Sequence, residues 1–436
     1  IRHIFTEERT YMKWMIRTGS TPAERARLRV VYALAGTVFF MPLNLFVMEG
    51  FFVMALLLGL YYMMRYPRLP LRKGPLSMPA VGFAVAAFLS LIGSPHFFMG
   101  TAFYVFTVLQ YLLLYYGILI FVHRSWERRM LFSALLFSAF AVALYGLYQY
   151  AHMLVLNNAE WVDEAAFPLL RRRMYSTLYN PNLLSAFLLI VMSASASMMI
   201  CTRHYWHRVM YLVLLAILTL CLVLTYSRGA WLSVGALVFF FGLFWDKRVW
   251  LLFLAAPLIG AFYHGGVADR LLSIFSHSEA DTSVAMRMDM WEAAIAMFLD
   301  HPLFGIGWGA FKHVYPVYNE LIQEAGIVIF HAHNMYLNFL AETGLVGTFF
   351  GLWFFFGNAW YAIRYVKDHH VRTFDRSLSM TLAASVLSLA ISGISDYDLF
   401  STQISLTFWL MSALFANMFG ELCEKSNKNS LRNNSQ

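Results

Sequence analysis

Charged residues are scarce in this sequence of 436 residues. Asp, Glu, Lys and Arg make up 13% of it, whereas hydrophobic residues make up 60%. A soluble globular domain is about half apolar and about a quarter charged, so this composition excludes an ordinary soluble protein. Apolar runs recur from Val30 to Gly420, and each is close to the length that crosses a bilayer. The sequence therefore predicts an all-α, polytopic membrane protein.

Cysteine is scarce as well. None of the three cysteines, Cys201, Cys221 and Cys423, falls in a predicted outer loop, and no Cys-x-x-Cys or Cys/His metal spacing occurs. This excludes a disulfide framework and a cysteine-ligated zinc site. The first 27 residues are polar and basic, so we expect no cleavable signal peptide.

The apolar runs predict about twelve transmembrane helices. Nine of them occupy residues 29–263 and three occupy residues 345–420. The remaining segments are a cytoplasmic N-terminal tail, a large outer loop and a disordered cytoplasmic C-terminal tail, which we place at residues 1–28, 264–344 and 421–436.

The positions of the basic residues orient the chain. With the N-terminus in the cytoplasm, 25 of the 32 lysines and arginines fall on the cytoplasmic side, as membrane insertion favours. The net charge of +8 therefore needs no nucleic-acid partner. The basic residues left outside are the informative ones, and they are Arg171, Arg172, Arg173, Arg228, Arg270, Arg287 and Lys312.

Two of these outer arginines are candidate anion-binding residues. Arg228 lies in a tight turn between two predicted spans, at a depth where an unpaired arginine is costly. Arg287 lies in a Met-rich segment whose apolar spacing predicts an amphipathic helix, and there it shares a face with Trp291. The planar guanidinium group suits phosphate oxygens. The alternatives are a snorkelling Arg228 at a helix end and a solvated Arg287 paired with an acidic neighbour.

Histidines open the predicted span that follows the large loop. His333, in the run from His331 to Gly344, falls at the outer membrane–water boundary, where its ring can accept a proton from a hydroxyl group. His331 and His333 also suggest metal ligands. In a helix, however, residues at i and i+2 do not face each other, and no third ligand is evident. We therefore expect no metal site.

Further outer residues are candidate substrate-binding groups. The run Arg171, Arg172 and Arg173 precedes Asn180, and it suits anionic head groups or sugar phosphates unless nearby acidic residues balance it. Asp396 and Asp398 lie between the last two predicted spans. Their carboxylates could orient a catalytic base or bind sugar hydroxyls, and the alternative is that they belong to a solvated turn. Aromatic residues such as Trp291 and Tyr336 suit the faces of sugars. The glycine-rich segment 302–309 is interpreted as a structural turn, because no strand precedes it and no Lys-Ser/Thr follows it.

Taken in order, these segments resemble the O-antigen ligase/polymerase superfamily of bacterial membrane glycosyltransferases, and most closely O-antigen ligase. The matching stretches are Tyr179–Asn182, Ser227–Gly229, Arg287 with Trp291, Pro302 with Gly305–Gly307 and Phe311, and His333 through Gly344. The resemblance covers roughly residues 175–420, and before that it rests on hydropathy alone.

The resemblance implies transfer of a glycan from an undecaprenyl-diphosphate carrier to a sugar hydroxyl of lipid A–core at the periplasmic face of the bacterial inner membrane. It implies that Arg228 and Arg287 hold the diphosphate and that His333 acts at the acceptor. It also implies inversion of the anomeric centre without a metal or other cofactor. The absence of an Asp-x-Asp motif on the outer side agrees with a lipid-linked donor.

Three other functions stay open at this point. A polymerase or a protein O-glycosyltransferase of the same superfamily differs from a ligase only in its acceptor. A transporter for bicarbonate or another small anion belongs to a different class, and it should carry charged or broken-helix sites near the middle of the bilayer. We see no buried ionic pair in any predicted span, which disfavours the transporter.

Overall fold

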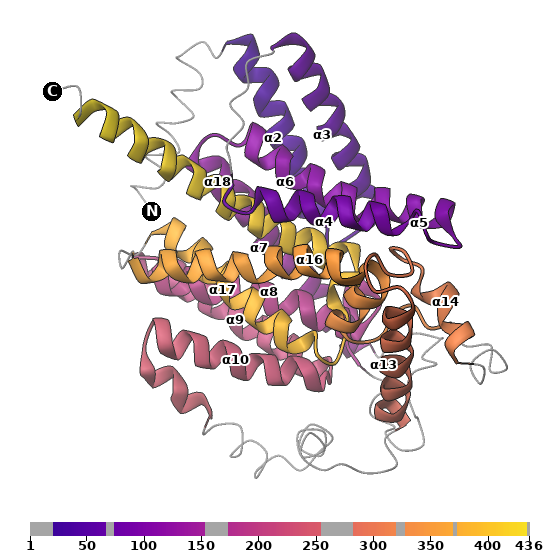
Figure 1. Cartoon of the computed structure of the whole chain (residues 1–436). Helices are drawn as coiled ribbons and strands as arrows, with labels where there is room; N and C mark the ends of the chain where they lie inside the picture. Colours follow the sequence, from indigo (N-terminus) through magenta and orange to yellow (C-terminus); the bar gives the residue numbers. More distant parts are fainter. Residues whose placement is uncertain are drawn as a thin grey trace.

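A computed structural model of the chain describes residues 21–66, 74–152, 173–253, 282–319, 328–368 and 373–433. Within these ranges the protein is all-helical (Figure 1). The N-terminal half contains α2 (Pro22–Phe40), α3 (Leu45–Arg65), α4 (Ser77–Ser90), α5 (Phe97–Tyr104), the π-helical turn η1 (Val105–Leu109), α6 (Gln110–Phe121), α7 (Ser125–Ala151), the 3₁₀ turn η3 (Ser176–Leu178), α8 (Pro181–Cys201) and α9 (Tyr205–Leu224).

The C-terminal half continues the helical bundle and adds two helices outside it. It contains α10 (Arg228–Phe244), the 3₁₀ turn η4 (Lys247–Leu251), α13 (Thr282–Asp300), α14 (Phe311–Tyr318), α16 (Met335–Asp368), α17 (Phe374–Ser392), the 3₁₀ turn η5 (Asp398–Phe400) and α18 (Thr402–Asn433). Figure 1 shows α13 and α14 together at one end of the bundle, with α13 lying across the helix ends.

Eight helical stretches in the described ranges are long and apolar enough to cross a membrane, which confirms a polytopic membrane protein. They are Leu45–Arg65, Phe97–Phe121, Ser125–Ala151, Pro181–Cys201, Tyr205–Leu224, Met335–Asp368, Phe374–Ser392 and Thr402–Glu424. The helices Ser77–Ser90 and Arg228–Phe244 are apolar but shorter. The count of twelve spans and the division of the chain into membrane and loop segments remain predictions.

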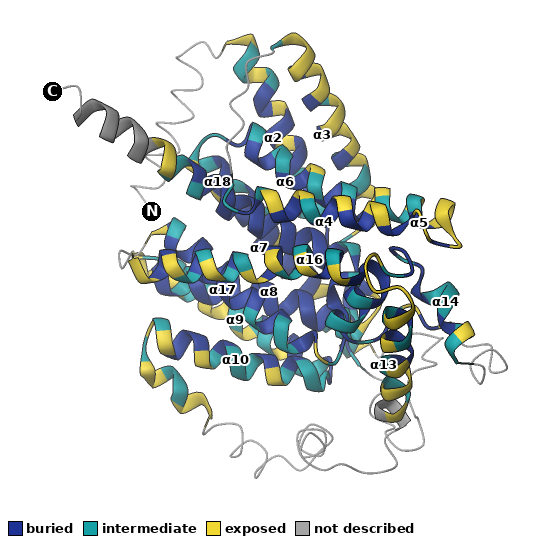
Figure 2. Ribbon diagram, in the orientation of Figure 1, coloured by how far each residue is buried: buried dark blue, intermediate teal, exposed yellow. Residues whose placement is uncertain are grey.

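The centre of the bundle is built around α8, and its helical neighbours include α9 and α17. In the apolar part of α8, 83% of the residues are buried, against 17% for α9 and 28% for α3. Figure 2 shows this contrast between the buried interior and the exposed face of α3. Small residues from Ser193 to Ser197 let neighbouring helices approach α8 closely, as is typical of packing within membranes. The exposed apolar faces of α3 and α9 are suited to contact lipid.

Two helix boundaries differ from the sequence prediction. Helix α16 begins at Met335, inside the predicted outer loop, and Gly344 kinks it with φ 60° and ψ −163°. Helix α18 continues to Asn433, although we predicted a disordered tail from residue 421. Lys and Leu are good helix formers, so the polar composition of this segment did not prevent the helix from continuing.

The kink at Gly344 is stabilised by the glycine-rich segment that follows α13. The backbone N–H groups of Leu345 and Val346 donate to the carbonyls of Pro302 and Leu303, at 2.9 and 3.2 Å. In return, the N–H of Ile306 donates to the carbonyl of Ala341 at 2.9 Å. Backbone groups released by a broken membrane helix need such partners. The interpretation of residues 302–309 as a structural turn is confirmed.

Replacing Gly344 by alanine should shorten the lifetime of the folded protein. A Cβ atom there would lie 2.4 Å from the Leu303 carbonyl, and positive φ is costly for any residue with a side chain. We expect a loss of about 1–3 kcal/mol, measured as faster thermal inactivation in detergent. Gly50→Ala is the matched control, because nothing lies within 4 Å of a Cβ at Gly50. Equal lifetimes for the two variants would contradict the kinked, positive-φ conformation of Gly344.

The bundle does contain a buried ionic pair, although Arg27 lies before the first predicted span and Glu127 lies between two predicted spans. The guanidinium Nη2 of Arg27 lies 2.5 Å from Oε1 of Glu127, and both side chains are almost inaccessible. Arg27 also donates to the Phe121 carbonyl and to Glu24. Both members lie near the N-terminal ends of their helices, α2 and α7. The positive-inside orientation predicts a cytoplasmic position for these ends, so the pair fits a structural anchor better than a transport site at mid-membrane.

Candidate active site

The segment before α16 holds His333 in an unusual backbone conformation. His333 has φ 45°, which is rare for a residue with a side chain, and it precedes the first helical residue, Met335. Asn334 caps the helix, because its Oδ1 accepts the N–H groups of Tyr336 and Leu337, both at 3.0 Å. Such left-handed, side-chain-supported positions cluster at functional sites.

The same segment is tied to the turn between α17 and α18. The N–H of Met335 donates to the carbonyl of Gly393 at 2.8 Å, and Nδ2 of Asn334 donates to the carbonyl of Ile394 at 3.0 Å. These two bonds fix the start of α16 against residues 393–396. As a result, the ring of His333 lies beside Asp396, which is 63 residues further along the chain.

Asp396 is the central polar group of the site. Its Oδ1 lies 3.0 Å from Nδ1 of His333 and accepts the N–H of Tyr397, while Oδ2 accepts a hydrogen bond from Nδ2 of Asn182 at 2.8 Å. Arg173 extends the network, since its Nη2 donates to Oδ1 of Asn182 at 2.6 Å. The carboxylate is therefore held by partners from three separate parts of the chain.

Interactions with neighbouring groups keep Asp396 ionised although it is buried. Burial alone would raise the pKa of this carboxyl group. The charge and hydrogen bond of His333 outweigh burial and hold that pKa well below its ordinary value, with smaller contributions from His331 and Arg287. Asp396 is thus a carboxylate at neutral pH, able to orient an imidazole and to stabilise it when it becomes protonated.

The hydrogen bonds assign different tautomers to the two histidines. Nδ1 of His331 accepts the backbone N–H of His333 at 3.2 Å, so His331 carries its proton on Nε2. Burial, reinforced by the charge of His333, lowers the pKa of His331 to about 3, and its ring is neutral. In His333, Nδ1 donates to Asp396, which leaves Nε2 as the proton-accepting nitrogen of the ring. The arrangement is that of a general base oriented by a carboxylate.

The same groups form a set of potential metal ligands. His331, His333 and Asp396 each offer one ligand atom within 4.8 Å of the others, and the two rings lie 4.3 Å apart. The argument that residues at i and i+2 cannot face each other was wrong, because this segment is not helical. Histidine and carboxylate ligands suit zinc and related ions. Against a metal, Nδ1 of His331 already accepts a backbone hydrogen bond.

Arg228 and Arg287 reach this region from two different helices. Arg228 is the first residue of α10, and the next residue, Gly229, packs closely on Ser395, beside Asp396. The N-terminus of a helix attracts anions, so α10 and the Arg228 side chain act in the same direction. Arg287 lies on α13, near enough for its charge to lower the pKa of Asp396. Both arginines are half-buried.

The other candidate substrate-binding residues have varied surroundings. Trp291 is one turn beyond Arg287 on α13, and its indole N–H is buried with no hydrogen-bond partner among the described residues. The hydroxyl of Tyr336 donates to the carbonyl of Ala390, and the side chain of Asn180 caps α8. Arg171 and Arg172 lie outside the described residues. The binding roles of all these residues stay predictions.

Asp398 differs from Asp396 in its protonation. It is 3% exposed, and its Oδ2 accepts the hydroxyl of Ser392 at 2.5 Å. Burial, reinforced by the charge of Asp396, raises the pKa of Asp398 to about 8. From the sequence we considered both aspartates and favoured Asp398 as the candidate substrate-binding residue. The geometry puts Asp396 next to His333, and both aspartates are buried, so the solvated-turn interpretation was wrong.

The predicted amphipathic helix is confirmed as α13. Its buried positions are Met290, Ala293, Ala294 and Met297. They form a second apolar cluster with residues of the glycine-rich segment, of α14 and of the segment before α16, such as Ile306, Phe311 and Ala332. This cluster holds α13 over the end of the bundle (Figure 1). The charge of Arg287 on this helix reaches Asp396.

Comparison with known proteins adds two findings. A family model described as O-antigen ligase matches residues 210–352, a segment that includes Arg228, Arg287 and His333 but not Asp396. An uncharacterized protein from Haemophilus influenzae is 24% identical over 212 residues, which are 42% of this chain and 52% of that protein. The chain thus spans about half the length of this curated relative.

Proposed function

We propose that the chain is an O-antigen ligase of the bacterial inner membrane, because residues 210–352 match a family model described as O-antigen ligase. It transfers a glycan from an undecaprenyl-diphosphate carrier to a sugar hydroxyl of lipid A–core at the periplasmic face. The observation that carries this proposal is the pair of His333 with buried Asp396, beside two arginines that the family segment also contains.

The reaction we propose inverts the anomeric centre in one step. The acceptor hydroxyl gives its proton to Nε2 of His333 while its oxygen forms a bond to the anomeric carbon. The bond from that carbon to the carrier phosphate breaks, and its electron pair leaves with the diphosphate. Asp396 stabilises the resulting imidazolium, and Arg228 and Arg287 stabilise the growing phosphate charge, which is the largest electrostatic demand of the step.

The rival functions differ in what they require of the chain. A polymerase or a protein O-glycosyltransferase uses the same chemistry with another acceptor, so only the acceptor separates them from a ligase. A small-anion transporter requires a charged or broken-helix site at mid-membrane. The ionic pair of Arg27 with Glu127 lies near helix N-termini, and the kink at Gly344 is filled by backbone from residues 302–306. Both observations disfavour transport.

An acceptor assay tests the proposal. Purified full-length protein is given an undecaprenyl-diphosphate-linked glycan together with lipid A–core, a second donor molecule or an acceptor protein, each in a separate reaction. A ligase forms a glycan–lipid A–core product and releases undecaprenyl diphosphate. A longer carrier-linked glycan would make the protein a polymerase, and a glycosylated acceptor protein would make it a protein O-glycosyltransferase. No product in any reaction would overturn the transferase proposal.

Transfer should be unaffected by removing divalent metal ions. We expect full activity after treatment with EDTA, because the reaction relies on arginine side chains and on a neutral imidazole rather than on a Lewis acid. The measurement is initial rate before and after EDTA, followed by addition of Zn²⁺, Mn²⁺ or Mg²⁺. Loss of activity that one of these ions restores would assign the set of His331, His333 and Asp396 to a metal instead.

A further inference from the structure

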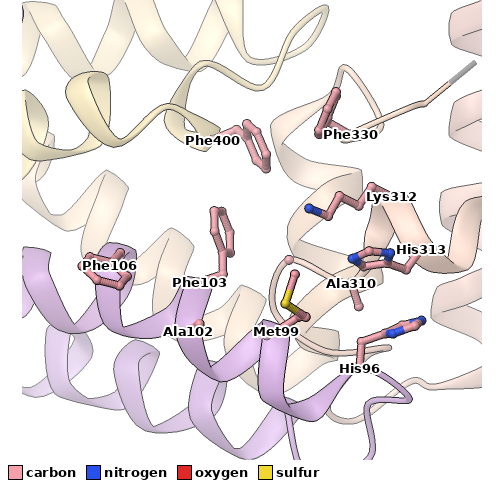
Figure 3. A pocket seen from close by; sticks show the side chains of 12 residues that line it. His96, Met99, Ala102, Phe103, Phe106, Ala310, Lys312, His313, Phe330 and Phe400 are labelled. Carbon is pink, nitrogen blue, oxygen red and sulfur yellow. The ribbon is translucent and has the colours of Figure 1, made fainter. Parts of the chain in front are cut away.

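A cavity lies close to the candidate active site, between α5, η1 and the loop that leads into α14. Its volume is about 270 Å³ (Figure 3). Its walls come from four parts of the chain that are distant in sequence, and the lining residues that matter here are Met99, Phe103, Phe106, Lys312, His313 and Phe400. This cavity could not be predicted from the sequence, since His96 and His313, which both line it, are 217 residues apart.

The polar lining of the cavity is entirely basic. Lys312, His313 and His96 contribute the only ionisable side chains among the twelve lining residues, and no carboxylate is among them. The rings of His96 and His313 lie 4.4 Å apart. Nε2 of His313 is buried and has no hydrogen-bond partner among the described residues. A buried polar atom of this kind requires an explanation, and a bound anion supplies one.

The basic side chains that line the cavity lie close enough to affect one another. Burial lowers the pKa of His313, and the nearby charges of His96 and Lys312 lower it further. These three groups repel one another when they are charged. A phosphate group between them would relieve that repulsion and would accept hydrogen bonds from all three.

The remaining wall of the cavity is apolar and continues onto a surface suited to lipid. Phe103 and Phe106 belong to the apolar stretch Phe97–Phe121, which is long enough to cross the membrane. Phe106 is 62% exposed and Met99 is 63% exposed, so the apolar wall extends beyond the cavity along this stretch. A hydrocarbon chain that leaves the cavity along α5 and η1 would therefore enter the bilayer.

One aromatic ring connects the cavity to the active site. The ring of Phe400 lies 5.8 Å from that of Phe103, inside the cavity, and 5.0 Å from that of His331. Nδ1 of His331 in turn accepts the backbone N–H of His333. A ligand in the cavity is thus linked to the catalytic pair through the side chains of Phe400 and His331.

We propose that this cavity binds the phosphate group of a membrane lipid, with Lys312, His313 and His96 around the phosphate and the hydrocarbon chain against Phe103 and Phe106. The cavity would then be a second phosphate site, distinct from the one formed by Arg228 and Arg287. Only its relevance to glycan transfer rests on the proposed function; the binding itself does not. Where the protein is a ligase, the cavity holds a phosphorylated lipid substrate or product beside the reacting groups.

The test measures binding without turnover. Full-length protein in phosphatidylcholine nanodiscs is exposed to a photoreactive phosphatidic acid, and cross-linked peptides are identified by mass spectrometry. We expect cross-links to the segments around Met99–Phe106 and Lys312. The double variant Lys312→Gln, His313→Asn should lower their yield about tenfold, since it removes two charge-assisted hydrogen bonds. The matched controls are Lys247→Gln and His301→Asn, which lie outside the cavity lining and should leave the yield unchanged.

Further cross-linking experiments identify the ligand and test whether the variants are folded. Lys312→Arg keeps the charge and should retain cross-linking, which shows that the site and not the fold is being measured. A short-chain prenyl diphosphate should compete as well as a soluble phosphatidic acid does, whereas inorganic phosphate should compete poorly. Equal cross-linking by a photoreactive diacylglycerol, which has no phosphate, would overturn the proposal, and so would an unchanged yield in the double variant. His333→Asn should still bind the lipid, so a failure of the transfer mechanism is told apart from a failure of this proposal.

Discussion

Replacing His333 by asparagine should reduce glycan transfer at least about 100-fold, the usual contribution of a positioned general base. Asparagine keeps a polar group near Asp396 but cannot accept a proton from the acceptor hydroxyl. The measurement is the initial rate of transfer by purified protein at saturating donor and acceptor. His301→Asn is the matched control, because His301 is an exposed histidine outside the network around Asp396.

The companion variant Asp396→Asn separates catalysis from folding. Asp396 orients the ring of His333 and stabilises it when protonated, so we expect a large loss of transfer in this variant too. The loss in the double variant should be close to that of His333→Asn alone, because both residues act as one unit. Wild-type rates in His333→Asn, with normal insertion and elution of the protein, would remove the histidine from the mechanism. Additive losses would show that the two residues act independently.

The membrane fold could be predicted from the sequence because hydropathy and charge act locally. Long apolar runs and the cytoplasmic excess of basic residues indicate a polytopic protein without any knowledge of its packing. The amphipathic face of α13 was likewise visible in the spacing of Met290, Ala293 and Met297. The start of α16 was not visible, because a glycine such as Gly344 indicates a helix boundary when only the local sequence is considered. In the structure, hydrogen bonds to the backbone of Leu303 let the helix continue past the kink. In physical terms, the missing information was a long-range hydrogen bond.

In the candidate site, too, local features could be predicted from the sequence and long-range contacts could not. His333, Arg228 and Arg287 could be named from their neighbours in sequence and from where they fall relative to the membrane. The choice of Asp396 over Asp398, and the link through Asn182 to Arg173, depend on the turn between α17 and α18 meeting the start of α16. Likewise, assuming a helix at His331 and His333 hid their proximity, which arises from the left-handed conformation of His333.

Replacing Arg228 by lysine should lower kcat/KM for the donor about 10- to 100-fold, which corresponds to the loss of one hydrogen bond between charged groups, about 1.5–3 kcal/mol. Lysine keeps the charge, but its ammonium group cannot make the paired contacts that a planar guanidinium makes with phosphate oxygens. Arg287→Lys should behave in the same way, because we propose that both arginines contact the same diphosphate, Arg228 from the start of α10 and Arg287 from α13. The matched control is Arg364→Lys, on the stretch of α16 that the charge pattern predicts to be cytoplasmic.

The kinetic pattern of the arginine variants identifies the substrate that they hold. If Arg228 and Arg287 bind the carrier diphosphate, the loss appears in the donor's kcat/KM, and KM for the acceptor stays near its wild-type value. If they act mainly on the charge that develops as the carrier leaves, kcat falls with little change in either KM. A rise confined to the acceptor's KM would contradict both roles and would assign these arginines to the acceptor instead. In that case both arginines would bind the acceptor beside His333 and Asp396, and the donor diphosphate would need another site. The basic cavity at Lys312 and His313 is the strongest candidate for that site in the described part of the chain.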